Sequence, residues 1–217
     1  MREYVIQSIL DTKLIAIVRG MKEDVMLPLA KALIDGGMNM IEVTFNQSNP
    51  ASFESTANAI TAIIKEFGKD VVAGAGTVCT MEQLKMANDA GAKYIITPVC
   101  NPELIKEVRR LGLVAIPGVL TPTECLEAHD AGADFCKLFP IGNMGPGYLK
   151  AISAPLNHLK FLAVGGITEK NAKEYLNAGA SGFGIGGHLL NKEWIDAGEF
   201  GKITALTRKF VEAVKHT

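Results

Sequence analysis

The sequence lacks a strong charge of either sign and any long hydrophobic run. Its 217 residues carry 22 Lys and Arg against 23 Asp and Glu, and no basic cluster stands out. Nucleic acid and anionic membranes are therefore not expected as partners, because both are bound through many cations on one face. The longest apolar runs, such as Leu14 to Val18, are far shorter than a membrane span. Glu3, Gln7 and Asp11 interrupt any secretory signal, so we expect a cytoplasmic protein.

Cysteines are also few, and their spacing predicts neither disulfides nor a metal centre. Cys79, Cys100, Cys125 and Cys136 contain no CxxC pair and stand in apolar or helical contexts, which is typical of reduced core thiols. Cys125 and Cys136 could join His129 on a metal ion, but zinc needs a fourth ligand and none stands nearby. We expect no metal and no cofactor.

A short pattern that recurs along the chain predicts alternating helices and strands. Helical segments end in Gly, as at Gly91, Gly132 and Gly179, and an apolar run follows directly. Glycine there forms the left-handed cap of a helix, and an unbroken apolar run is typical of a strand buried on both faces. The expected strands are Leu14 to Arg19, Met40 to Thr44, Val71 to Thr77, Tyr94 to Thr97, Val114 to Pro117, Phe135 to Phe139, Phe161 to Gly165 and Gly182 to Ile185. The expected helices are Asp24 to Ile34, Ala51 to Phe67, Met81 to Ala90, Pro102 to Leu111, Pro122 to Ala131, Glu169 to Ala178 and Phe200 to Lys215.

Eight such units in a chain of this length favour an α/β fold of the (β/α)8 TIM-barrel class over an open doubly wound sheet. Arg2 to Asp11 is expected to form an extra N-terminal helix that covers the bottom of the barrel. No Pro- or Ser-rich linker divides the chain, so residues 1–217 are expected to form one domain.

Two charged residues inside the expected strands are the main candidates for chemistry. Lys137 shares a strand face with Phe135 and Phe139, and burial there would favour the neutral amine that forms a Schiff base with a carbonyl. Glu42 shares a face with Met40 and Thr44, and a buried carboxyl with a raised pKa can shuttle protons. The alternative is a buried Lys–Glu ion pair without chemistry, and such pairs are costly to bury.

The other strand ends supply candidates for binding a substrate. Arg19 could hold a carboxylate with its planar guanidinium, and Thr77 could add a hydroxyl. Thr97-Pro98 ends another strand, and Phe139 follows Lys137. The last two strands end in Gly165-Gly166 and Gly186-Gly187-His188, where this fold commonly holds a phosphate on backbone N–H groups. Gly182 to Gly187 also matches GxGxxG, but no βαβ unit or acidic residue follows at the spacing of a dinucleotide site.

Six segments together resemble the class I family of 2-keto-3-deoxy-6-phosphogluconate and 4-hydroxy-2-oxoglutarate aldolases, including its 6-phosphogalactonate branch. They are Ile15 to Gly20, Ile41 to Thr44, Gly74 to Val78, Ile96 to Pro98, Pro117 to Glu124 and Lys137 to Pro140, in order along the whole chain. The resemblance implies that Lys137 is the Schiff-base lysine, that Glu42 is the general acid and base, and that Arg19 and Thr77 bind the pyruvate carboxylate. It also implies a keto-acid phosphate substrate, no metal and a homotrimer.

Four residues at three places in the chain depart from part of that family. Some members have an Arg where this chain has Asn46, and Arg19 takes over that role in members with the Ile-X-Arg-Gly pattern. Gluconate-type members have Thr at the position of Val164, whereas galactonate-type members have Val there, as this chain does. Gly187 and His188 replace the Ser of the last phosphate loop. The sequence therefore leaves open which of the gluconate, galactonate and unphosphorylated hydroxyglutarate compounds is the substrate.

The residues by themselves also leave two other functions open. One is a phosphate-binding barrel isomerase or epimerase that uses Glu42 as a base and Lys137 only for its charge. The other is a barrel without catalysis that binds sugar phosphates as a sensor or scaffold.

Overall fold

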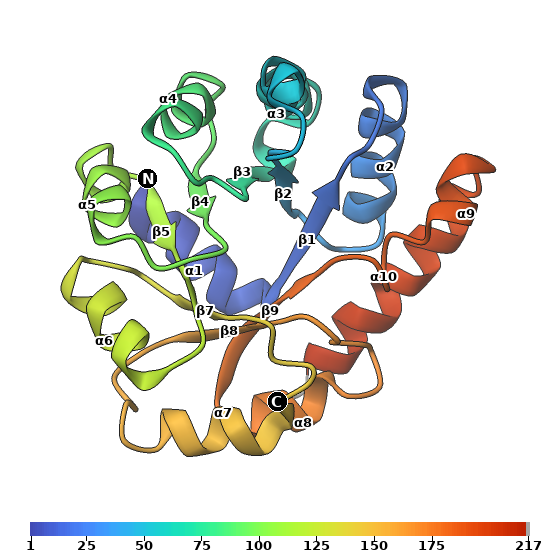
Figure 1. Cartoon of the computed structure of the whole chain (residues 1–217). Helices are drawn as coiled ribbons and strands as arrows, with labels where there is room; N and C mark the ends of the chain where they lie inside the picture. The colour runs from blue at the N-terminus through green and yellow to red at the C-terminus, as the bar shows by residue number, and fades with distance from the viewer. Residues whose placement is uncertain (216–217) are drawn as a thin grey trace.

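The computed structural model describes residues 1–215, and these form a ring of parallel strands surrounded by helices (Figure 1). The strands are β1 Leu14–Arg19, β2 Met40–Thr44, β3 Val72–Gly76, β4 Tyr94–Ile96, β5 Val114–Ile116, β6 Gly118–Val119, β7 Cys136–Leu138, β8 Phe161–Val164 and β9 Ala180–Ile185. The helices are α1 Arg2–Thr12, α2 Glu23–Asp35, α3 Phe53–Phe67, α4 Met81–Asp89, α5 Pro102–Arg110, α6 Pro122–Asp130, α7 Gly145–Ser153, α8 Ala172–Asn177, α9 Lys192–Asp196 and α10 Phe200–Lys215. Short 3-10 turns occupy Pro50–Ser52 and Gly68–Asp70.

The nine strands fill the eight strand positions of a barrel, because β5 and β6 are two halves of one broken strand. The sheet runs β5-β4-β3-β2-β1-β9-β8-β7-β6, so its two ends are adjacent in sequence and are separated only by Pro117. Proline has no N–H to donate, which interrupts the ladder at that point. The first half pairs with β4, the second half pairs with β7, and the Lys137 N–H donates to the Pro117 carbonyl at 2.9 Å. The predicted TIM barrel is therefore confirmed.

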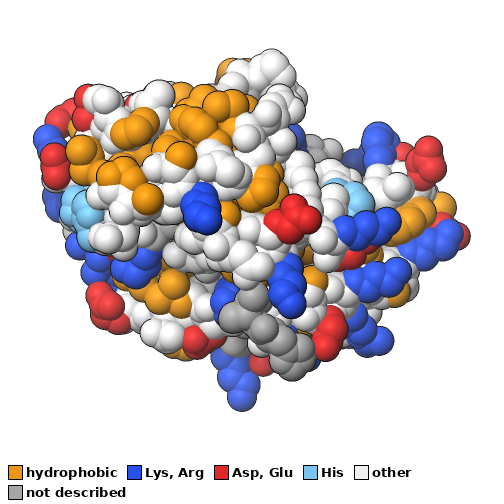
Figure 2. All heavy atoms as spheres, turned by 90° about the horizontal axis from the view of Figure 1, so that it is seen from below, with side chains coloured by type: hydrophobic (Ala, Val, Ile, Leu, Met, Phe, Trp, Pro, Cys, Tyr) orange, Lys and Arg blue, Asp and Glu red, His pale blue; other side chains and the backbone are white. Residues whose placement is uncertain are grey.

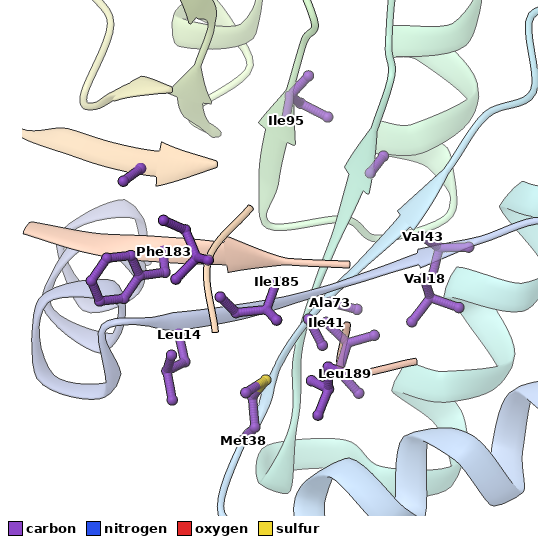
Figure 3. Packing of buried hydrophobic residues seen from close by; sticks show 14 of the residues in the cluster. Leu14, Val18, Met38, Ile41, Val43, Ala73, Ile95, Phe183, Ile185 and Leu189 are labelled. Atoms are coloured by element: carbon purple, nitrogen blue, oxygen red, sulfur yellow. The ribbon is translucent and has the colours of Figure 1, made fainter. Parts of the chain in front are cut away.

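Alternation along each strand separates two buried apolar layers. One layer lies between the strands and the surrounding helices and includes Leu14, Ile41 and Phe183 (Figure 3). The other fills the inside of the barrel and includes Ile15, Met40 and Phe135. Because neighbouring residues of a strand point to opposite layers, the register fixes which polar side chains enter the barrel.

Helix α1 closes the N-terminal end of the barrel, as the sequence predicted. Val5 and Ile9 are 1% and 0% exposed and pack in the inner layer. The Arg2 guanidinium forms an ion pair with Asp134, whose carboxylate also accepts from the Ala115 N–H at 3.0 Å. The opposite, C-terminal end of the strands stays open for a ligand.

The predicted helix boundaries are largely confirmed, and one is wrong. Thr121 caps α6 in a capping box with Glu124, as expected from the Thr-Pro-x-Glu pattern. Helix α8 begins at Ala172 and not at Glu169, because Thr168 and Asn171 close a side-chain turn first. The expected strand from Phe135 to Phe139 is shorter, at Cys136–Leu138.

Two further helices lie where the sequence pattern set no boundaries. Helix α7 starts in Gly145-Pro146-Gly147, which is typical of a loop, and α9 spans only five residues after an Asn191 cap. Among the described residues, no helix has the length and hydropathy that crossing a membrane requires.

Candidate active site

Lys137 points into the barrel from β7. Its side chain is 5% exposed, and its ammonium nitrogen lies 4.9 Å from the centre of the Phe139 ring. Burial lowers the pKa of Lys137, and the charge of Arg19 acts in the same direction while Glu42 opposes it. An ordinary lysine is neutral in roughly one molecule in 2,500 at pH 7, and each unit by which the pKa falls raises that fraction about tenfold. Burial therefore raises the share of this amine that is in its neutral, nucleophilic form.

Glu42 points into the barrel from β2 and is 1% exposed. Burial raises its pKa, although the charges of Lys137 and Arg19 pull the pKa down. Glu42 and Lys137 attract each other, yet no ion pair within 4.0 Å joins them in the part of the chain that the structure describes. This arrangement does not match the structural ion pair considered above, since no carboxylate of residues 1–215 holds the amine directly. It keeps a buried carboxyl group near a buried amine.

Two glycines of β3 make room for the polar groups inside the barrel. A Cβ added to Gly76 would lie 1.7 Å from Glu42 Oε1, and one added to Gly74 would lie 2.3 Å from the Tyr94 ring. The Gly74-Ala75-Gly76 segment thus has no side chain on the inner face of β3, which leaves room there for Tyr94 and Glu42. Position and rotamer of the Glu42 carboxyl depend on that space.

Gly76→Ala is expected to lower turnover at least about a hundredfold, because the added methyl group displaces the Glu42 carboxyl and about 1 Å of misplacement costs that much. Steady-state turnover rates measure the loss. Gly201→Ala in α10 is the matched control, since its Cβ meets nothing within 4 Å. Equal turnover in both variants would show that the Glu42 position does not limit the reaction.

Arg19 and Thr77 meet at the open end of the barrel, as the sequence suggested. The Arg19 guanidinium donates to Thr77 Oγ1 at 3.2 Å. Thr77 has a φ of +54°, a conformation that is rare and strained for a β-branched residue. The Gln47 amide donates to the Thr77 carbonyl at 2.7 Å, and the Gln83 amide donates to Gln47 at 3.0 Å. These bonds hold the strained residue with its hydroxyl against the Arg19 guanidinium.

Sequence reasoning missed the two glutamines that hold Thr77. Gln83 is 0% exposed, accepts from the Cys79 N–H at 2.7 Å and completes a capping box with Thr80. The Thr-x-x-Gln spacing from Thr80 to Gln83 was the available signal. Gln47 follows β2 in a loop, where the sequence shows no such pattern.

The glycine-rich ends of β8 and β9 line one cavity together. It has a volume of about 410 Å³ and is lined by Ile17, Arg19, Phe139, Val164 to Thr168, Gly184 and Gly186 to His188. Gly165 and Gly166 have φ of +97° and +73°, which favours glycine at both positions. His188 Nε2 lies 2.8 Å from Glu169 Oε2, a partner that the sequence pattern did not indicate. The predicted phosphate loops therefore do meet at one site.

A second cavity of about 520 Å³ adjoins the first. It shares Ile17, Arg19, Gly186 and Gly187 with the first cavity and extends toward α9. The described linings of the two cavities do not include Lys137 or Glu42, which lie deeper in the barrel. Phe139 connects the first cavity with the buried Lys137 below it, because Phe139 lines that cavity and its ring contacts the Lys137 amine.

Pro98 lies on the other side of Lys137. Gly118 pairs with Lys137 in the β6–β7 register, and a Cβ on Gly118 would lie 2.5 Å from the Pro98 carbonyl. The structure thus brings the predicted binding residues to the same end of the barrel, around Lys137 and Glu42.

Three comparisons with known proteins agree. A sequence model described as KDPG and KHG aldolase matches residues 5–206. The chain is 36% identical over 177 residues to the 2-dehydro-3-deoxy-6-phosphogalactonate aldolase of Escherichia coli K12, covering 81% of this chain and 83% of the relative. It is 37% identical over 191 residues to the KHG/KDPG aldolase of that organism, covering 87% and 86%. A crystal structure of KDPG aldolase from Legionella pneumophila, with pyruvate captured at low pH as a covalent carbinolamine intermediate, matches with a TM-score of 0.84 at 30% identity over 94% of this chain and 96% of that chain.

Proposed function

The chain belongs to the KDPG and KHG aldolase family, whose members are carbon–carbon lyases, and we propose that it cleaves a 2-keto-3-deoxy-6-phospho-aldonate to pyruvate and glyceraldehyde 3-phosphate. The observation that carries this proposal is the buried Lys137 amine, which is directed into the barrel without a paired carboxylate. Cleavage of 4-hydroxy-2-oxoglutarate to pyruvate and glyoxylate is the related reaction that the same centre supports.

Lys137 starts the reaction as a neutral amine. Its nitrogen attacks the C2 carbonyl of the substrate, and a proton moves from nitrogen to oxygen to give a carbinolamine. Glu42, acting through a water molecule, donates a proton to the departing hydroxyl. The products of this step are water and a protonated imine on Lys137.

The protonated imine is the electron sink for cleavage. Glu42, now a carboxylate, takes the proton of the C4 hydroxyl, and the electrons of the C3–C4 bond move into the imine. The aldehyde fragment leaves, and an enamine remains on Lys137. Protonation at C3 and hydrolysis release pyruvate and restore the free amine. Without the imine, the bond would have to leave an unstabilised carbanion.

We assign the two ends of the substrate to separate groups at the mouth of the barrel. Arg19 and Thr77, 3.2 Å apart, bind the carboxylate next to the reacting carbonyl. Pro98 and Phe139 flank the Lys137 adduct. The phosphate occupies the loops of Gly165, Gly166, Gly186, Gly187 and His188, where it accepts from backbone N–H groups.

We also propose that the enzyme is a homotrimer without a metal or an organic cofactor. In the described residues, no group of three His, Cys, Asp or Glu could hold a metal ion. Apolar side chains stand exposed at Val99, Leu126 and Met144. Figure 2 shows hydrophobic side chains gathered over the upper left part of the face that it draws, with charged side chains scattered mainly around the rim. An exposed apolar patch is typical of a contact between subunits.

Pyruvate release from the candidate keto acids tests the proposed function. We expect turnover with 2-keto-3-deoxy-6-phosphogluconate or with 2-keto-3-deoxy-6-phosphogalactonate. The ratio of the two rates identifies which stereochemistry of the substrate the enzyme prefers. EDTA is expected to leave the rate unchanged, because the mechanism draws its electron sink from Lys137 alone. No pyruvate from any of the compounds would contradict the proposal, and loss of activity in EDTA would favour a metal-dependent aldolase.

A further inference from the structure

Tyr94 carries a hydroxyl group at a place where the fold needs only a ring. The residue lies on β4 inside the barrel and is 0% exposed. Its Oη is one of four buried side-chain oxygens of the described residues without a hydrogen-bond partner, together with Asn39 Oδ1, Glu42 Oε2 and Thr44 Oγ1. Leaving a buried hydroxyl unsatisfied is unfavourable, whereas Phe would pack the same ring without that cost. The hydroxyl therefore calls for a partner inside the barrel.

The register places Tyr94 in the same layer of the barrel as Glu42. Glu42 pairs with Gly74 across β2 and β3, and Ala75 pairs with Ile95, so Gly74 lies beside Tyr94. A Cβ on Gly74 would lie 2.3 Å from Tyr94 Cε2, which shows that the ring crosses over Gly74. Because Gly74 has no side chain, only the backbone of β3 lies between Tyr94 and Glu42.

Tyr94 is a permanent proton donor in this position. Burial and the charge of Glu42 raise its pKa well above 10, so the phenol keeps its proton throughout the range in which an aldolase acts. The other groups that act on Glu42 are the cations Lys137 and Arg19. The Cys79 thiol lies near Lys137, and burial raises its pKa as well. Tyr94 is thus the neutral donor facing Glu42 from β4.

We propose that Tyr94 is a positioning residue for Glu42, which it holds through one buried water molecule between its hydroxyl group and Glu42 Oε2. The water accepts from Tyr94 and donates to the carboxylate, so all three groups are satisfied. The bridge fixes the rotamer of the carboxyl, with its other oxygen directed to the reaction, and it stabilises the charged form. The proposal rests on the role of Glu42 given under the proposed function.

Tyr94→Phe tests this role, because it removes only the hydroxyl group. We expect kcat to fall about tenfold or more while KM changes little, since the substrate contacts remain. Loss of the donor disfavours the carboxylate, so the pKa of Glu42 rises and the acid limb of the kcat–pH profile moves to higher pH. A purely structural role for the hydroxyl would not move that limb.

Tyr175→Phe is the matched control, because Tyr175 is also buried but lies on α8 outside the barrel. Its pH profile is expected to match that of the unaltered enzyme. Thermal unfolding of both variants checks the fold. An acid limb at its original pH in Tyr94→Phe overturns the proposal, whatever happens to kcat. Failure of the proposed function is seen separately, as an unaltered enzyme that releases no pyruvate.

Discussion

Lys137→Met abolishes pyruvate release, with an expected loss of at least about a thousandfold in kcat, because the reaction has no electron sink without an imine. The unbranched Met side chain fills the space of the Lys stem inside the barrel, where Lys137 is 5% exposed. Thermal unfolding of the variant checks that the fold is retained. Loss of activity with a retained fold then assigns the effect to the amine.

Borohydride trapping is the measurement that identifies the adduct. With pyruvate present, reduction is expected to attach a pyruvyl group to Lys137 of the unaltered enzyme and to leave Lys137→Met unlabelled. Lys85→Met is the matched control, because Lys85 is an exposed residue of α4 that pairs with Asp89 at 2.6 Å. Peptide mass analysis locates the label.

Two outcomes would contradict the Schiff-base mechanism. One is an unmodified Lys137 under conditions of turnover. The other is activity in Lys137→Met close to that of the Lys85→Met control. If Glu42 were still essential in that case, the result would favour an isomerase or epimerase that uses Lys137 only for its charge.

The second large effect is expected for Glu42→Gln. Gln has the shape of Glu, so it fits beside Gly76, but it cannot exchange a proton with the carbinolamine or with the C4 hydroxyl. We expect kcat to fall about a hundredfold to ten-thousandfold, the usual contribution of a general acid and base. Binding of the substrate carboxylate should persist, because Arg19 and Thr77 are untouched.

Trapping and a control variant separate Glu42 from general effects of charge. Borohydride with pyruvate should still label Lys137 in Glu42→Gln, although more slowly. Glu82→Gln, an exposed position in the first turn of α4, should keep full activity. Unimpaired turnover in Glu42→Gln would place the base elsewhere.

The sequence predicted much of the fold because its signals are local. The glycine caps and apolar runs indicated eight barrel strands, and segments such as Tyr94 to Ile96 and Phe161 to Val164 form strands where expected. The errors lie where local signals compete. Thr168 and Asn171 close a turn before α8, and Pro117, which has no backbone N–H to donate, splits one barrel strand into β5 and β6.

For the candidate site, the sequence indicated most residues but not what holds them. Lys137 and Glu42 stood out as charges within apolar strands, and parallel strands in a barrel bring their ends together. Glu169 sits beside His188 and Gln47 beside Thr77 through contacts between distant loops, with sequence separations of 19 and 30 residues. No local pattern encodes such pairs.

By itself, the sequence determined which side chains carry charge within buried strands, and therefore which residues are candidates for Schiff-base and proton-transfer chemistry. The tertiary structure alone decided how deeply these side chains are buried, that Tyr94 and Glu42 pack against Gly74 and Gly76, and that Glu42 and Tyr94 share one layer. The physical reason is that pKa values and proton paths depend on desolvation and on neighbours across the barrel. Those neighbours come from strands that are distant in sequence, and the register of the closed sheet alone sets them side by side.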